Sequence, residues 1–381
     1  MSAGAEEAVL IDALRTPYGR RGGALAAWHP VDLAAVLISE LVGRNRLDGG
    51  EVDGVLLGCV SQVGAQACNI ARNAVLAAGW SDQVAAVTVD CQAISSFQAV
   101  YWAAQAAMAG NQGLLVAGGV EMASQVPLGA NQAVPSVGKP YGPRLRARSF
   151  GEGRFAPPGI AIEELARTCG FSRVQLDSWA VRSHERASRG QIASSRGVLA
   201  VAVDPAVHAP SQKGGRGIRA TAVVESDEAV DAALTTERMA AFAPIFVEGG
   251  VITAANIAAE GDGAAAVIVC GARRAKSLGL IPAARFVSVA LAGCDPRLWP
   301  AASIPATKRA LQAARLHPGD IDSFEVHESS AAAVLAWLEG VGADPDRVNP
   351  NGGALAHTAP AGAAGAGLFV NALACTRGAG R

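Results

Sequence analysis

The hydrophobic and polar positions of the first 120 residues follow two alternating periodicities. Apolar, β-branched runs that fit buried strands occupy residues 8–15, 52–60, 87–89 and 113–121. Stretches with apolar positions three and four residues apart, which fit amphipathic helices, lie between these runs at 30–45, at 69–79 and after residue 93. Strands that alternate with helices predict an α/β fold with a mostly parallel sheet.

The third strand and its helix enclose a tight turn in "VTVDCQAISSFQAVYWAAQAAMAG", residues 87–110. A turn of this kind presents a nucleophile at a helix N-terminus, where unpaired N–H groups and the helix dipole stabilise a thiolate or an oxyanion. The residue at the turn is Ala93, whose methyl group has no such chemistry. Cys91 lies two residues earlier, on the same face of an extended strand.

A different composition begins after residue 120. Residues 121–248 are richer in Pro, Gly, Arg and Ser, and two helices are predicted there, at 160–169 and 173–189. Long irregular segments inside a compact enzyme are usually functional loops or lids. We therefore interpret 121–248 as an inserted loop or cap domain.

The first pattern then begins again. A strand is predicted at 283–293, a helix at 306–316, a strand at 321–329, and a Gly-rich turn that enters a helix at 349–373. The second half reads as a degenerate copy of the first, without a strand after its final helix. We expect an N-terminal half at 1–120 continued by 249–275, the inserted domain at 121–248, and a truncated C-terminal half at 276–381 that lacks its last strand or strands.

Composition excludes several classes of function. The 381 residues are 50% hydrophobic and 17% charged, with a formal net charge of −1, which favours neither nucleic acid nor an acidic membrane surface. No apolar run reaches the ~18 residues of a membrane span, and the N-terminus lacks a basic secretory signal. The seven cysteines never take metal-ligand spacing, so we expect reduced thiols, no metal site and a cytoplasmic protein.

Six ordered blocks of residues resemble the thiolase family across essentially the whole chain. They are "RTPYGRRGGAL" (15–25), "NIARNAVLAAG" (69–79), "AGGVEMAS" (117–124), "GVITAANIAAEGDGAAAV" (250–267), "EVHESSA" (325–331) and "NPNGGALAHTAP" (349–360). The resemblance implies a thiolase-like five-layered α-β-α-β-α fold of two similar halves with an inserted loop domain. It also implies acyl-CoA chemistry, in which one cysteine accepts an acyl group, a second moves protons and a histidine activates the nucleophile.

The sequence departs from the family pattern at the catalytic positions. The resemblance puts Ala93 at the nucleophile and Ala359 at the catalytic histidine, so both functions are lost. His327 stands where the family has Asn, and Ser330 where it has Phe. The turn that carries the second catalytic cysteine would follow the end of this chain, and Cys375 falls in the final helix instead.

Loss of a covalent nucleophile or its base lowers a rate on the order of 10⁴-fold. We therefore expect a thiolase-like acyl-CoA-binding protein of acyl-CoA and lipid metabolism without ordinary cysteine-dependent acyl transfer. One alternative is relocated chemistry, through Cys91 and His357 or by retro-aldol cleavage through His327 and His357, with Glu328 beside His327. Another alternative is a purely structural subunit kept for assembly.

The resemblance also suggests which residues meet coenzyme A. Thr253, Ala254 and Asn256 come from the 250–267 block, Gly353 from the second Gly-rich turn, and Arg219 from the basic piece 211–219. No tightly bound cofactor is expected, because coenzyme A or acyl-CoA is a ligand that comes and goes. As partners we expect a homo-oligomer, a dimer or tetramer, or another chain that completes the C-terminal sheet.

Overall fold

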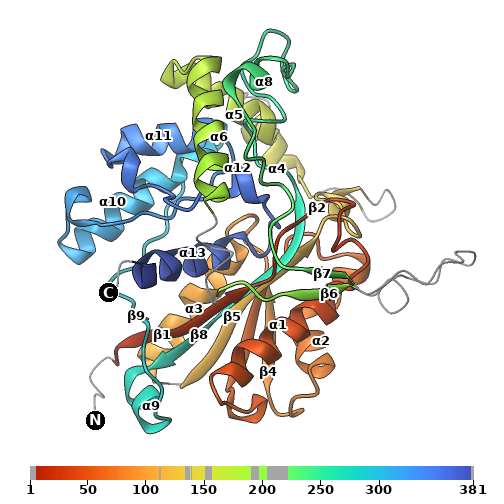
Figure 1. Ribbon diagram of the computed structural model, residues 1–381, viewed down its shortest axis with the longest axis vertical. Coiled ribbons are helices and arrows are strands. Elements are labelled where there is room, and N and C mark those ends of the chain that lie inside the picture. Colours follow the sequence, from red (N-terminus) through yellow and green to blue (C-terminus); the bar gives the residue numbers. More distant parts are fainter. Residues whose placement is uncertain are drawn as a thin grey trace, which may run out of the picture.

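A computed structural model describes residues 6–110, 113–133, 138, 140–150, 157–189, 197–203 and 222–378 (Figure 1). Its strands are β1 (Ala8–Arg15), β2 (Gly19–Arg20), β3 (Gly54–Gly58), β4 (Ala85–Val89), β5 (Leu114–Met122), β6 (Val201–Val203), β7 (Ala222–Val224), β8 (Gly261–Gly271) and β9 (Ala284–Arg285).

The helices fall into three groups along the chain. The first third holds α1 (Pro30–Arg44), α2 (Ile70–Ala77) and α3 (Ser95–Ala109). The inserted region holds α4 (Pro143–Leu145), α5 (Pro158–Cys169), α6 (Arg173–Ser188) and α8 (Thr236–Ala240). The last third holds α9 (Ala272–Ser277), α10 (Ser303–Ala314), α11 (Ala331–Val341), α12 (Ala354–His357) and α13 (Ala364–Gly378). Short 3₁₀ turns and one π turn join them, at Gly49–Glu51, Gly64–Gln66, Ala130–Gln132, Arg146–Phe150, Pro296–Ala302, Pro318–Asp320 and Pro345–Arg347.

One sheet dominates the described structure, with the strand order β4-β3-β5-β8-β1-β9 and β2 paired to β8. Strands β4, β3 and β5 are parallel, whereas β8 runs antiparallel to both β5 and β1. The sheet is therefore mixed rather than mostly parallel. The central pair β5 and β8 is buried at every position, which suits its near-continuous apolar sequence.

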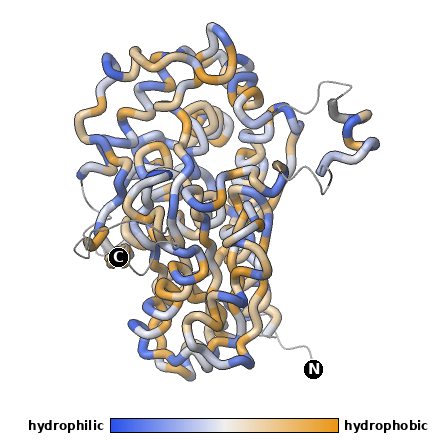
Figure 2. The backbone as a smooth tube through the Cα atoms, turned by 90° about the vertical axis from the view of Figure 1, so that its right-hand side faces the viewer, coloured by the Kyte–Doolittle hydropathy of each residue, from blue (hydrophilic) through white to orange (hydrophobic). Residues whose placement is uncertain are grey.

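Helices cover both faces of this sheet. The apolar face of α1 packs with α2 on one side, around Leu37, Val75 and Ile268. On the other side α3 and α13 pack together over β5 and β8, around Val100, Val267 and Val370. A second core lies between α5, α6 and α11 in the upper part of the molecule (Figure 1). In Figure 2, hydrophobic segments of the chain lie in both the lower and the upper part of the molecule.

The two halves of the chain meet where glycines allow close backbone contact. A Cβ on Gly119 would lie 2.0 Å from the carbonyl oxygen of Gly362, so β5 and the turn before α13 touch only because neither has a side chain. The N–H of Ala366 in α13 donates to Oγ of Ser96 at 2.9 Å, at the start of α3. The Gly-rich turn of the second half is therefore held against the Ala93 turn of the first.

Most elements agree with the sequence predictions. The strands and helices expected in the first 120 residues, both helices of the inserted region, and the helices expected near 306–316 and after residue 360 are confirmed. Residues 249–275 contribute β8 to the first half's sheet.

Two strand predictions in the second half are wrong. Within 283–293 only β9 forms, and residues 321–329 make a single bridge, from Phe324 to Val348. Beyond β9, neither segment lies beside long paired strands such as β5 and β8. Their backbone groups therefore cannot form the hydrogen bonds of a sheet. Among the described residues, the second half therefore forms no sheet of its own.

Candidate functional site

The turn before α3 has the shape that the sequence suggested. Gln92 adopts a left-handed conformation with φ 55°, and Oγ of Ser95 accepts from the N–H of Cys91 at 2.9 Å and donates to the carbonyl of Gln92 at 2.5 Å. Ala93 is partly exposed beside the first turn of α3. The backbone scaffold for a nucleophile is present, with a methyl group at its apex.

Cys91 is exposed on this turn. Partial burial of the thiol, together with the nearby Asp90 carboxylate, raises its pKa. A reactive cysteine requires the opposite shift, because the thiolate is the nucleophile. Cys91 does not line the cavity that contains His357.

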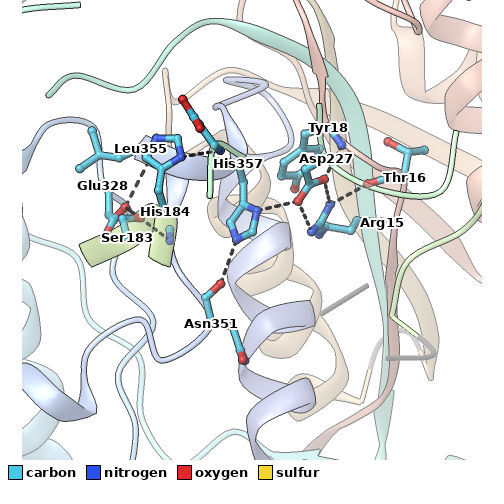
Figure 3. A network of polar contacts seen from close by, with 12 residues as sticks. Arg15, Thr16, Tyr18, Ser183, His184, Asp227, Glu328, Asn351, Leu355 and His357 are labelled. Atoms are coloured by element: carbon cyan, nitrogen blue, oxygen red, sulfur yellow. Dashed lines mark hydrogen bonds and ion pairs between the residues drawn. The ribbon is translucent and has the colours of Figure 1, made fainter. Parts of the chain in front are cut away.

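In the second turn, Ala359 and His357 have different neighbours. The N–H of Ala359 donates to the carbonyl of Ala259 at 2.9 Å. Ala359 also forms an isolated parallel β-bridge with Glu260. Thr358, between them, has a positive φ of 74°, which few residues other than glycine adopt. His357 points instead toward β1 and the segment after β7 (Figure 3).

A charged cluster of Arg15, Asp227 and His357 lies behind this turn (Figure 3). The guanidinium of Arg15 binds both oxygens of Asp227, at 2.7 and 2.8 Å, and Nδ1 of His357 lies 2.6 Å from Oδ2 of Asp227. All three side chains are at least nine-tenths buried. Burial alone would raise the pKa of Asp227, but the attraction of Arg15 and His357 outweighs it and holds that pKa well below its usual range.

Asp227 escaped the sequence analysis. It follows the inserted region's last strand, more than 100 residues from either partner, in the acidic run "ESDE". Only the tertiary structure selects one acid of that run, because contact between such distant residues leaves no local pattern.

Glu328 is held in a network of hydrogen bonds within the fold. Its carboxylate is fully buried and accepts hydrogen bonds from four donors: Nε1 of Trp179, Oγ of Ser183, Nδ2 of Asn349 and the N–H of Leu355. It thereby joins α6 of the inserted region to α12.

His327, the next residue back, lines a small cavity with His357. Burial lowers the pKa of His327 to about 4, so its imidazole is neutral at physiological pH. The structure thus brings His327 and His357 together, and it does not bring Cys91 or Ala93 to the same cavity.

That cavity has a volume of about 30 Å³. Its lining includes Arg15, Tyr18, His327, His357, Thr358 and Asn371, with Gly353, Ala354 and the first turns of α13. A larger hollow of about 430 Å³ lies apart from both turns, between α6 and α11.

A second polar cluster surrounds Cys375 in α13. Its Sγ accepts from Nδ2 of Asn351 at 3.1 Å and lies 3.5 Å from Oε1 of Glu325. Burial, followed by the effect of Glu325, raises the pKa of Cys375 to about 12. Burial also raises the pKa of Glu325 to about 8, so both groups are largely protonated at neutral pH.

The residues suggested for coenzyme A occupy different settings. Thr253 and Asn256 are buried, and Asn256 donates to Oδ1 of Asp177 and accepts from the N–H of Thr253, which ties the loop to α6. Ala254 is exposed beside them, and Gly353 lines the small cavity. Arg219 lies outside the described residues.

Two negative findings apply to the described part of the chain. No three His, Cys, Asp or Glu side chains there gather as metal ligands. None of the helices described is long and apolar enough to cross a membrane.

Together, the mixed sheet covered by helices on both faces, the turn scaffold at residue 93 and the second Gly-rich turn packed near it define an α/β protein. The family described as "Thiolase, N-terminal domain" matches residues 8–273, and "Thiolase, C-terminal domain" matches residues 280–379. The chain belongs to the thiolase family.

Individual relatives agree with this assignment. The chain is 38% identical to the steroid 3-ketoacyl-CoA thiolase FadA6 of Mycobacterium tuberculosis, over 96% of this chain and 87% of that protein. It is 37% identical to the 3-oxoadipyl-CoA/3-oxo-5,6-dehydrosuberyl-CoA thiolase of Escherichia coli, over 96% and 92%. The solved acetyl-CoA acetyltransferase of Bacillus anthracis superposes with a TM-score of 0.86 at 30% identity, covering 100% of this chain and 94% of that one.

Proposed function

We propose that this chain binds an acyl-CoA or a 3-ketoacyl-CoA in acyl-CoA metabolism and does not carry out cysteine-dependent acyl transfer. Support for the ligand class comes from family membership and from relatives whose names specify CoA thioesters. The observation that carries the second part is the intact turn at α3 with Ala93 at its apex.

The neighbouring thiols support the same conclusion. A pKa raised by burial keeps Cys91 and Cys375 as thiols near neutral pH, and thiols are poor acyl acceptors. Neither cysteine lines the cavity that contains His327 and His357.

A calorimetric titration with acetyl-CoA, acetoacetyl-CoA and free CoA tests the binding. We expect saturable binding in the micromolar to millimolar range, and no heat from any of the three would contradict it. Acyl transfer should be at least about 10⁴-fold below that of an active thiolase assayed alongside.

A restored variant tests why turnover is absent. Ala93→Cys with Ala359→His returns the family's nucleophile and histidine to the two turns. Thiolysis by the double variant above the parent rate would place the defect at these positions. The same variant carrying Cys91→Ala is the matched control, and its rate should be unchanged. If Cys91→Ala in the parent background abolished acyl transfer, a relocated nucleophile would replace our proposal.

One observation favours a second candidate, retro-aldol cleavage of an acyl-CoA by the two histidines. His327 and His357 line the same cavity, and the imidazole of His327 is neutral at physiological pH because burial lowers its pKa to about 4. Incubation with a 3-hydroxyacyl-CoA and detection of the aldehyde product tests it, with His327→Gln as the variant that should lose the activity.

A further inference from the structure

The chain between β7 and α8, residues 225–235, runs along the outside of the molecule and joins its lower and upper parts (Figure 1). This segment, here called the strap, contains no helix or strand. At its lower end, the carboxylate of Asp227 binds the guanidinium of Arg15 through both oxygens. The carboxylate of Glu228 accepts from the N–H of Arg20 at 2.9 Å. The first half of the chain therefore holds the lower end of the strap.

The upper end of the strap is held by a histidine of α6. The N–H of Asp231 donates to Nδ1 of His184 at 3.0 Å. The ring of His184 also donates a hydrogen bond to the backbone of Leu355. Because Nδ1 accepts, it carries no proton, and the proton of the neutral ring lies on Nε2. The upper attachment thus requires one tautomer of neutral His184.

Protonation of His184 would place two donors opposite each other. Nδ1–H would then face the N–H of Asp231, which leaves both donors without an acceptor at this contact. The carboxylate of Asp231 is already engaged, since Oδ1 accepts from the N–H of Ala233 at 2.9 Å and Oδ2 lies 3.0 Å from Arg238. The protonated ring therefore cannot hold the strap as the neutral ring does.

The groups around His184 favour the neutral ring. Burial is the main cause that lowers the pKa of His184 from 6.5, and the interactions with His357 and Arg20 lower it as well. Asp231 and the hydrogen bond to Leu355 act in the opposite direction without outweighing the burial. The stability that the neutral ring contributes is complete above pH 6.5 and is lost as the pH falls through the lower pKa of the folded chain.

We propose that His184 is a pH-sensitive latch for the strap: its neutral ring holds the upper end on α6, and protonation releases that end alone. The lower end stays attached in mild acid. Burial would raise the pKa of Asp227, but the attraction of Arg15 and His357 outweighs it and keeps the carboxylate charged. In mild acid the strap is then fixed at one end only.

Hydrogen exchange of the full chain, corrected for the intrinsic rate at each pH, tests the latch. Asp231, Ala233 and Leu234 carry the hydrogen-bonded N–H groups of the upper end. Between about pH 7.5 and pH 5 their protection should fall about tenfold. The N–H groups of Tyr18 and Arg20, which donate to the lower end, should keep theirs. Unchanged protection of the upper end would overturn the proposal, and so would an equal loss at both ends.

His184→Asn separates the latch from other effects of acid. The amide oxygen of Asn accepts a hydrogen bond as Nδ1 does, and it does not titrate. Protection at 231–234 should therefore stay within about threefold of the parent at pH 7.5 and should not fall at pH 5. His29→Asn is the matched control, because His29 is exposed and its Nδ1 accepts from the N–H of Val31 at the start of α1. The control should keep the parent's fall, and the same fall in His184→Asn would overturn the proposal.

Nitrogen-15 NMR of the parent chain observes the ring of His184 directly and does not depend on the folding of a variant. At pH 7.5 the proton should lie on Nε2, with Nδ1 bare. The signal of bare Nδ1 should disappear over the same pH range in which the protection of 231–234 falls. A proton on Nδ1 at pH 7.5 would overturn the proposal.

Discussion

The two halves of the chain share a sequence pattern and differ in what they build. In the first half β5 and β8 form the buried centre of a sheet, and β1, β3 and β4 pair around them. In the second half, residues 286–292 and 321–329 have strand-like sequences. Among the described residues they form no strand, and only one isolated bridge, from Phe324 to Val348. The comparison teaches that strand propensity requires a neighbouring strand, since the ladder satisfies the backbone.

A matched pair of substitutions tests whether β8 is more tightly packed than residues 286–292. It has the largest expected effect of the predictions that follow. Val267→Asp puts a charge at a fully buried position of β8, whereas Val287→Asp changes a side chain that is 56% exposed. Val267→Asp should cost about 4 kcal/mol or more and Val287→Asp about 0.5 kcal/mol or less. Urea unfolding measures both, and similar losses would show that 286–292 is as well packed as β8.

Two buried glutamates, one in each half, allow a second comparison of stability, with a smaller expected effect. Glu121 in the first half accepts from the N–H groups of Val60, Ser61 and Gly362 and from Gln66, while Glu328 accepts from four donors in the second half and α6. Glu121→Gln and Glu328→Gln each leave part of such a set unpaired, so each should cost about 2–3 kcal/mol.

Hydrogen exchange distinguishes the two variants. Glu328→Gln should speed exchange in α6 and α12, and Glu121→Gln in β5 and the turn before α13. A Glu328→Gln variant with normal stability and lost ligand binding would instead assign Glu328 to the site.

Glu325 predicts a loss of stability toward alkaline pH. Its pKa in the folded chain is about 8, raised from 4.5 chiefly by burial. The stability that it contributes is complete below pH 4.5 and disappears as the pH rises through 8, because folding then buries a charge. Relative to the parent, Glu325→Gln should gain stability between pH 4.5 and pH 8, by up to about 4 kcal/mol at pH 8, with little difference at pH 4.5. Denaturant unfolding at both pH values measures this.

His327 predicts a dependence of opposite sign. Burial lowers its folded pKa from 6.5 to about 4. The stability from its neutral ring is present above pH 6.5 and is lost as the pH falls toward 4. In His327→Gln, the fall in melting temperature between these limits should become shallower, and an unchanged slope would assign the acid sensitivity to other groups.

Thiol modification gives the smallest expected effect. Cys68 and Cys91 are exposed in the first half, and Cys59 and Cys270 are buried there. Because the pKa of Cys91 is raised, iodoacetamide should modify it no faster than Cys68, and the buried pair only after unfolding. Peptide mass spectrometry follows each site, and a Cys91 that reacts about tenfold faster than Cys68 would indicate an activated thiol.

Particular residues show which features of the fold can be predicted from the sequence. The turn at Ala93, the helix after it and the amphipathic α1 follow from local patterns, because their periodicity and their neighbours along the chain define them. The motif blocks are sufficient to recognise the thiolase family, which the family matches confirm. The same local patterns misled at 283–293 and 321–329, where the missing information is the presence of partner strands.

The sequence by itself thus determined the family, the first sheet's components and the alanines at the two turns. The tertiary structure decided which side chains meet: it paired His357 with Asp227 and Arg15, placed His327 beside the same cavity, and turned Glu328 toward α6. The physical reason is that charge compensation and burial depend on contacts between residues far apart in the chain, and a linear pattern records only near neighbours.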